Sequence, residues 1–158
     1  MNMKPMTSGV PSTYGAKGDS RNSAMIRVGR LLEVRVAAGY RSGADVDALF
    51  EELAQAVSTL EPGVPHVTVA DWRRCTIMSP ESAKRIVECM ASINPRTERS
   101  ATIAANDSPT AVLQFVRVMR DSGHPDRKLF TDKDELAAWL SEVLTPAEAE
   151  RLREFLTE

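Results

Sequence analysis

The sequence predicts an α/β protein with a mixed sheet of about five strands, packed with four or five helices. Two short segments near residue 25 alternate apolar and polar side chains, which is typical of half-buried strands. Gly29-Arg30 between them suits a tight turn, so they predict an antiparallel hairpin. Further along, strand-like segments alternate with segments whose apolar residues recur every three or four positions. That alternation predicts parallel strands joined by helical crossovers.

The hairpin is expected over residues 25–28 and 32–36. Its outer face is expected to be solvated and to carry charged side chains, namely Arg27, Arg30, Glu33 and Arg35. A helix follows, capped by Ser42 or Asp45. Its apolar stripe contains Val46, Leu49, Phe50, Leu53 and Val57. The next strand is predicted over 66–70, and whether helices cover one face of the sheet or both stays open.

A second helix is predicted after Ser79-Pro80, with Ala83, Ile86, Val87 and Met90 on its stripe. A short strand over 100–105 leads to a junction where Asp107 or Ser108 can cap a third helix. That helix carries Val112, Phe115, Val116 and Met119. A last strand over 127–130 precedes two more helices. Their apolar stripes contain Leu136, Trp139, Leu140 and Val143, then Leu152, Phe155 and Leu156.

Composition limits the class of protein. The 158 residues suffice for one domain, and 42% hydrophobic with 27% charged residues is ordinary for a globular chain. A net charge of -2 argues against nonspecific nucleic-acid binding. No apolar run resembles a signal peptide or a membrane span, so a cytoplasmic protein with reduced cysteines is expected. Residues 1–23, rich in Gly, Ser, Pro and Lys, are expected to be a disordered tail before a single domain over 24–158.

The junction after the strand at 66–70 is the strongest candidate for a binding site. In parallel α/β sheets, ligands and partners meet the protein where strands end and helices begin. Here Asp71 ends the strand, and Trp72-Arg73-Arg74 opens a short loop. Trp and Arg are enriched in protein interfaces, although this Trp side chain could instead fold back onto the core.

Catalytic motifs are absent from the sequence: it has no nucleophile elbow, phosphate-binding loop, dinucleotide fingerprint or zincin pattern. His66 and His124 lack the spacing of a metal site. Cys75 follows two arginines, which lower a thiol pKa, but we expect Cys75 and Ile77 to face inward and Cys75 to be structural. Cys89 lies within a predicted helix. Asp71 and Asp107 are expected to cap or brace loops rather than form a phospho-receiver cluster.

The order of elements resembles the STAS domain of the SpoIIAA-like superfamily over about residues 25–144. The resemblance rests on the hairpin, the amphipathic helix, the strand and acid at 67–71, the segment 75–82 and the closing segment 128–140. The family includes bacterial anti-sigma-factor antagonists, in which a serine of an Asp-Ser-Ser-Gly motif opening a helix is phosphorylated. In this alignment Glu81 stands at the phosphorylated serine, so the resemblance implies a site without its phosphoacceptor. Ser79 and Ser82 remain as candidate acceptors.

The resemblance implies a non-enzymatic regulatory module without a cofactor or metal. Its partner would be a protein, either a regulatory protein or a kinase-like anti-sigma factor. The partner-binding residues are expected to be Asp71, Trp72, Arg73, Arg74, Ser79, Glu81, Ser82, Asp107 and Ser108. One alternative, from lipid-binding relatives of the CRAL-TRIO type, is a small apolar ligand between the sheet and a mobile C-terminal helix. Another is an enzyme that uses Cys75 or a carboxylate pair.

Overall fold

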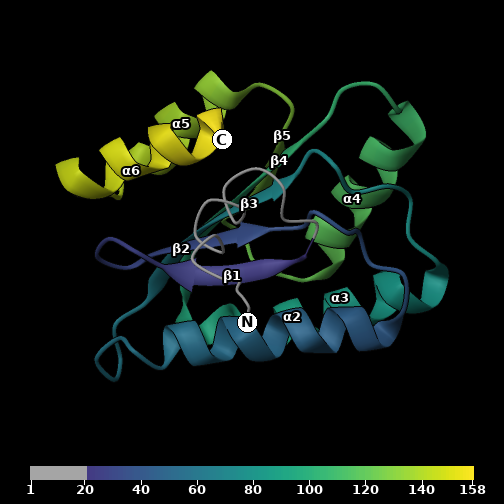
Figure 1. Ribbon diagram of the computed structural model, residues 1–158, viewed down its shortest axis with the longest axis horizontal. Coiled ribbons are helices and arrows are strands. Elements are labelled where there is room, and N and C mark those ends of the chain that lie inside the picture. The colour runs from purple at the N-terminus through teal and green to yellow at the C-terminus, as the bar shows by residue number, and fades with distance from the viewer. Residues whose placement is uncertain (1–20) are drawn as a thin grey trace, which may run out of the picture.

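The structure is a computed structural model and describes residues 21–158 (Figure 1). The tail predicted over 1–23 therefore lies almost wholly outside the described residues. The elements, in chain order, are β1 (Ser23–Ile26), β2 (Leu31–Arg35), α2 (Gly43–Val57), β3 (His66–Trp72), α3 (Pro80–Ile93), the 3-10 helix η1 (Asn94–Arg96), β4 (Thr97–Ala104), α4 (Pro109–Asp121), β5 (Arg127–Phe130), α5 (Lys133–Ser141) and α6 (Pro146–Thr157).

The strands form one sheet in the order β1-β2-β3-β4-β5. Strand β1 pairs with β2 in the antiparallel direction, and the other neighbours pair in parallel. The predicted mixed sheet with an initial hairpin is confirmed. Gly29 adopts a φ of 57° in the hairpin turn, a conformation that side chains with a Cβ disfavour.

Helices cover both faces of the sheet (Figure 1). The crossovers through α2, α3 and α4 each lead to the next strand in the same direction across the sheet. Because parallel crossovers are right-handed, this places all three helices on one face. The two helices after the last strand, α5 and α6, cover the opposite face. The question that the sequence left open is thus answered by the strand order.

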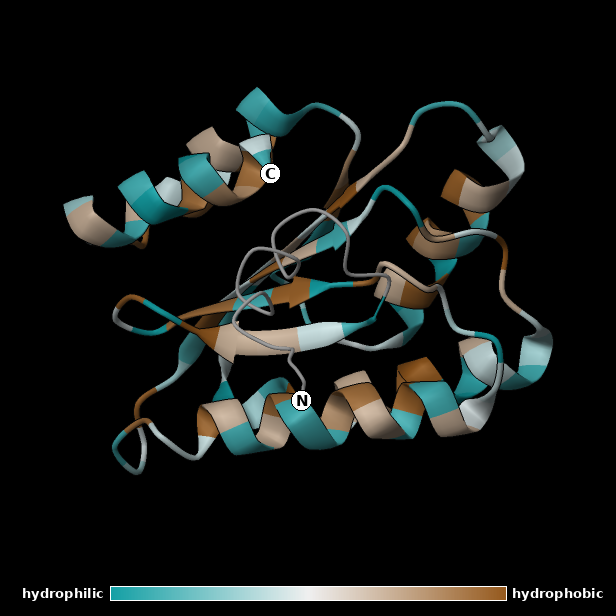
Figure 2. Ribbon diagram, in the orientation of Figure 1, coloured by the Kyte–Doolittle hydropathy of each residue, from teal (hydrophilic) through white to brown (hydrophobic). Residues whose placement is uncertain are grey.

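Alternation along the strands divides the core into two layers. Leu32, Val34 and Trp72 belong to the layer under α2, α3 and α4. The neighbouring positions Leu31 and Val69 belong to the layer under α5 and α6. In Figure 2 hydrophobic and hydrophilic segments alternate along the helices, as expected where one side of each helix packs against the sheet.

Side-chain oxygens cap the α-helices where the sequence predicts their starts. Ser42, Ser79, Ser108, Asp132 and Thr145 each accept a backbone N–H from the first turn. Pro80, Pro109 and Pro146 occupy the first helical position, where no N–H donor is needed. Local capping chemistry therefore fixes both strand-to-helix junctions of the candidate site.

The expectation that the outer face of the hairpin is solvated holds at Arg27, which is exposed, but is wrong at Glu33. Glu33 is only 4% exposed, because α6 lies across this face and Arg151 pairs with the Glu33 carboxylate. A second correction concerns α4, in which Val116 is exposed and Val118 is buried. The buried side of α4 is therefore rotated slightly around the helix axis from the predicted apolar stripe.

Candidate functional site

Asp71 organises the start of the loop that follows β3. Its Oδ1 accepts the backbone N–H of Arg73 at 3.0 Å and the Nε–H of the same residue at 2.9 Å. Its Oδ2 accepts Nη2 of Arg73 at 3.0 Å and Nη1 of Arg35 at 3.3 Å. Asp71 is thus a brace that fixes the direction in which the loop leaves the sheet, as predicted for its loop-bracing role.

The charge state of Asp71 follows from these contacts. Burial alone raises the pKa of a carboxyl group, because it disfavours the charged form. The hydrogen bonds from Arg73, together with the charges of Arg73 and Arg35, outweigh that effect and hold the pKa of Asp71 below its usual value. Asp71 is therefore a partly buried carboxylate in an ion pair, with no proton to give at neutral pH.

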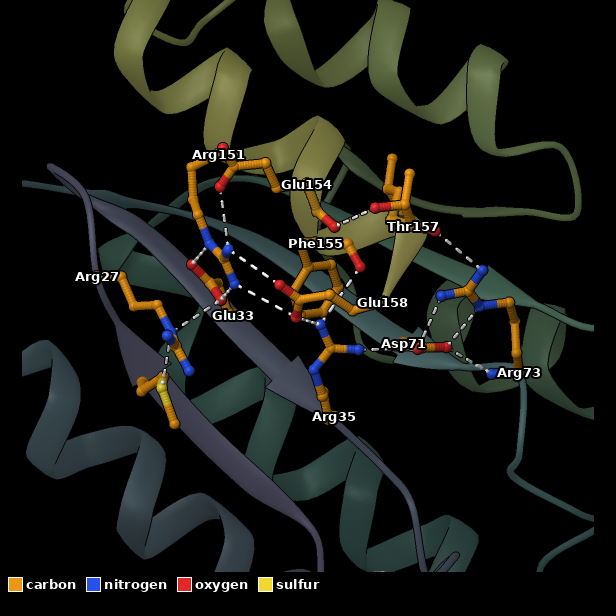
Figure 3. A network of polar contacts seen from close by, with 12 residues as sticks. Arg27, Glu33, Arg35, Asp71, Arg73, Arg151, Glu154, Phe155, Thr157 and Glu158 are labelled. Atoms are coloured by element: carbon orange, nitrogen blue, oxygen red, sulfur yellow. Dashed lines mark hydrogen bonds and ion pairs between the residues drawn. The ribbon is translucent and has the colours of Figure 1, made fainter. Parts of the chain in front are cut away.

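The brace continues into the C-terminal helix (Figure 3). Arg35 contacts the carboxylate of Glu158 and stacks its guanidinium 3.9 Å from the centre of the Phe155 ring. Nη1 of Arg73 donates to the backbone carbonyl of Leu156 at 3.2 Å. The last turn of α6 is therefore bound to β2 and to the first loop residue of the candidate site.

Trp72 lies in the core and not on the binding surface. It is 1% exposed and sits edge-on between Tyr40 and Phe115, with ring centres 5.7 and 5.1 Å away. Strand β3 is two residues longer than predicted, so period-2 alternation directs Trp72 to the face under α2, α3 and α4. The expectation that Trp72 contacts a partner is wrong.

The loop beyond Trp72 turns one cysteine inward and one isoleucine outward. Burial raises the pKa of the Cys75 thiol to about 12, which keeps it protonated at neutral pH. Ile77 is 53% exposed, which corrects the expectation that it faces inward. Met78 is then buried, and its backbone N–H and carbonyl both bond to the side-chain amide of Gln114, each at 2.9 Å. Gln114 thus ties the end of the loop to α4.

Between this loop and the start of α4 lies a groove of about 420 Å³. This size lies within the range of ligand sites in proteins. The loop contributes Arg73, Arg74, Cys75, Thr76 and Ile77 to it, and the second junction contributes Ala105, Asp107, Ser108, Ala111 and Phe115. We call it the β3–β4 groove, because it lies at the carboxyl ends of those two strands.

The charges in the β3–β4 groove differ in how they are held. Arg73 is fully engaged by Asp71 and Leu156, whereas Arg74 has no ion pair or hydrogen bond within residues 21–158. Asp107 is exposed and also unpaired within that range, and the hydroxyl of Ser108 caps α4. A partner can therefore reach one cation, one carboxylate and the apolar side chain of Ile77.

The start of α3, which directly follows this loop, presents a second surface. Glu81 is exposed in the first turn. Ser82 is completely buried, so it cannot accept a phosphate group from a kinase or contact a partner. The Ser79 hydroxyl accepts the N–H of Ser82 at 3.1 Å. Glu81 lines a second groove, of about 530 Å³, between the first turns of α2 and α3.

Apart from Asp71, which braces the start of the loop, the predicted site residues separate into three groups. Arg73, Arg74, Asp107 and Ser108 line the β3–β4 groove, Ser79 and Glu81 lie at the exposed start of α3, and Trp72 and Ser82 are buried. Sequence reasoning placed the binding surface on the loop over 71–78 but expected Ile77 to face inward, and it missed Phe115 and Gln114. Ile77 points outward because the chain turns directly after β3, and no periodic pattern in the loop sequence predicts that turn.

The two histidines have structural roles. His66 is buried, with Nδ1 2.9 Å from the Thr68 hydroxyl oxygen. Burial and the charges of Arg96, Arg127 and Arg30 lower the pKa of His66 to about 4. His124 bonds to the backbone carbonyl of Thr97 at 2.7 Å and accepts the N–H of Asp126. Among residues 21–158, no cluster of three or more His, Cys, Asp or Glu side chains is arranged to hold a metal.

The sheet order, the hairpin and the two layers of helices define a SpoIIAA-like fold, as the sequence resemblance implies. A similar solved structure is an uncharacterized protein of the DUF3478 family from Shewanella loihica PV-4, described as having a SpoIIAA-like fold. The match covers 86% of this chain and 99% of the other, with a TM-score of 0.50 and 18% sequence identity. No family model matches the chain, and no curated protein does. In residues 21–158, none of the helices has the length and apolarity needed to cross a membrane.

Proposed function

We propose that this protein is a non-enzymatic interaction module that binds a regulatory protein partner at the β3–β4 groove and the adjoining start of α3. The single observation that carries the proposal is the groove itself. It is built from both strand-to-helix junctions, lies at the carboxyl ends of the parallel strands and presents Arg74 and Ile77 outward. Ligands and partners of α/β sheets bind at these ends.

The chemistry of the groove favours binding over catalysis. Its thiol, Cys75, is protonated and buried, and the Ser108 hydroxyl is used as the cap of α4. Asp71, the carboxylate nearest to the loop, is bound by two arginines. Exposed arginine and apolar side chains at the centre of a concave surface are typical of contacts that dominate protein interfaces.

The start of α3 supports a partner surface that serine phosphorylation does not control. The resemblance to anti-sigma-factor antagonists places Glu81 at their phosphorylated serine. Here Glu81 is exposed in the first turn of α3, where a fixed negative charge is stabilised by the helix dipole. Ser82 is buried, and the Ser79 hydroxyl is used as the cap.

The alternative, an apolar ligand beneath a mobile C-terminal helix, has no supporting observation. Leu152, Phe155 and Leu156 are buried against the sheet. Arg35, Arg73 and Arg151 bind this helix to β2 and to the loop after β3.

Affinity capture from cell extract, compared between variants, tests the proposal. Arg74→Glu and Ile77→Asp change exposed groove side chains and should each lower recovery of the same partner at least tenfold. Glu81→Lys tests the start of α3 and should also weaken capture. The matched control is Arg117→Glu on the exposed side of α4, which reverses the same charge outside the groove and should leave recovery unchanged. Equal recovery with all four variants would contradict the proposed surface.

A further inference from the structure

Arg127, the first residue of β5, is a buried cation without a counter-ion. Its side chain is 6% exposed, and no carboxylate of residues 21–158 forms an ion pair with it. Nη1 donates to Oδ1 of Asn94 at 2.7 Å and to Oγ of Ser122 at 2.8 Å, both of which are neutral groups. A buried charge without a compensating charge costs several kcal/mol, so this arginine needs a further explanation.

The guanidinium has unused hydrogen-bond donors. Within residues 21–158, Nε and Nη2 of Arg127 have no hydrogen-bond acceptor. Neither nitrogen is completely cut off from solvent-accessible space. The side chain lines a cavity of about 30 Å³ between the sheet and the helices α2 and α3. The side chain that carries the free donors therefore borders space that no protein atom fills.

The same cavity contains further polar groups from the sheet. Ser100, which pairs with Arg127 across β4 and β5, and Thr102 both line it. Both residues are buried, and their hydroxyl groups have no side-chain hydrogen bond within residues 21–158. The rest of the wall is mostly apolar, with Tyr40, Leu53 and Ile93 among its residues. Polar side chains from two neighbouring strands therefore line one small space in otherwise mostly apolar surroundings.

Other cations lie at the same end of the sheet, although Arg30 among them is paired with Glu98 at 2.7 Å. Arg96, Arg30 and Arg127 are all near enough to His66 to lower its pKa. Burial lowers the pKa of Arg127 itself to about 10, which leaves the group charged at neutral pH. An anion in the cavity would restore the charge balance that no side chain supplies.

We propose that this cavity binds one monovalent anion of about the size of chloride, held by the free donors of Arg127 and the hydroxyl groups of Ser100 and Thr102. A cavity of about 30 Å³ accommodates one or two waters, or one such ion. The site is separate from the β3–β4 groove and does not depend on the proposed function. Bound there, the ion would stabilise the junction between β5, the end of α4 and the segment around Asn94.

Thermal unfolding at constant ionic strength tests the site, with bromide replacing gluconate, an anion too large to enter. For a chain of this size, bromide at tenfold excess over its dissociation constant raises the Tm by roughly 3–6 °C. We expect this rise for the wild-type protein and its loss in Arg127→Met. The matched control is Arg96→Met, which removes a positive charge at the same end of the sheet without touching the cavity, and it should keep the rise. Equal Tm values of the wild type in the two salts would overturn the proposal, as would an equal rise in Arg127→Met.

Two further measurements keep the test independent of whether Arg127→Met folds. The double variant Ser100→Ala/Thr102→Val keeps the arginine, and its bromide response should be smaller than that of the wild type. Crystals of the wild-type protein grown in bromide should show an anomalous peak within hydrogen-bond distance of Nε or Nη2 of Arg127. A cavity that contains only water in those crystals would refute the anion site.

Discussion

Cys75 follows two arginines in the sequence, yet its thiol lies in the core, and burial alone raises its pKa to about 12. His66 likewise starts a strand near several cations and is fully buried in its neutral form. In both residues the cost of removing a charge from water is the largest cause of the pKa shift, and for His66 the neighbouring arginines act in the same direction. Their chemistry at neutral pH is therefore set by position in the fold and not by the adjacent sequence.

Alkylation of Cys75 should be slow in the native protein. A pKa of about 12 instead of 9.0 makes the thiolate about 10³-fold scarcer at pH 7, and the thiolate is the reactive form. Iodoacetamide labelling followed by peptide mass spectrometry, in native buffer and in urea, gives the two rates. Fast and selective labelling of native Cys75 would instead support an enzyme that uses this thiol.

Stability should fall as the pH decreases from about 6.5 to 4. The folded state lowers the pKa of His66 from 6.5 to about 4, so the unfolded state binds the proton more readily in this range. The neutral form of His66 contributes its full share of the folding stability above pH 6.5, and up to about 3 kcal/mol of it is lost by pH 4. Urea unfolding across this range should show that His66→Gln is less sensitive to pH than the wild type. Parallel decreases in both proteins would exclude His66 as the cause.

At the scale of elements, α6 is held to the sheet by an ion pair that is nearly completely buried. Arg151 donates two hydrogen bonds of 2.8 Å to the carboxylate of Glu33. The capping-box residue Glu148 also accepts the N–H of Arg30 in the hairpin turn at 2.8 Å. The helix therefore contacts both the turn and the strand of the hairpin.

Arg151→Met should destabilise the protein by about 3 kcal/mol, because the buried Glu33 carboxylate then keeps only the longer ion pair with Nε of Arg27 at 3.7 Å. Adding Glu33→Leu should recover most of that loss, since the remaining surface is apolar. Urea unfolding of the two single variants and the double variant measures the coupling. Arg153→Met, an exposed position on the same helix, is the control and should change stability by less than about 0.5 kcal/mol. Additive losses in the double variant would show that the two residues do not interact.

Most elements were predictable because their signals are local. The hairpin alternation, the serine caps at 42, 79 and 108 and the prolines after two of them give the same order that the structure shows. The burial of Glu33 was not predictable, because its partner lies 118 residues away in the sequence. The prediction that Trp72 contacts a partner failed because no local signal shows that β3 continues beyond Asp71.

At the scale of the whole molecule, one sheet separates two apolar layers, and each layer contains one tryptophan. Trp72 packs between Tyr40 and Phe115 on one side. Trp139 contacts Phe130 on the other, with their ring centres 5.7 Å apart. Because β2, β3 and β4 contribute side chains to both layers, neither layer is complete without the sheet. The molecule should therefore unfold as one cooperative unit.

Single-tryptophan variants test this cooperativity. In Trp139→Phe, fluorescence reports the layer of α2, α3 and α4, and in Trp72→Phe it reports the layer of α5 and α6. Within each variant, the urea midpoint from fluorescence should equal the midpoint from far-ultraviolet circular dichroism. If Trp139 fluorescence changes at lower urea than the circular dichroism, α5 and α6 unfold first and the single transition is contradicted.

The contacts of α6 have a consequence for the order of folding during synthesis, when the N-terminal parts of a chain leave the ribosome first. Strand β2 emerges early, but Arg151, the residue that forms the close ion pair with Glu33, lies in α6. The last turn of α6 also covers the ion pair between Asp71 and Arg35. Until those residues emerge, the nascent sheet exposes a carboxylate and the apolar side chains of Leu31, Val67 and Val69. Helix α6 thus completes a sheet face that stays uncovered for as long as its residues have not been synthesised.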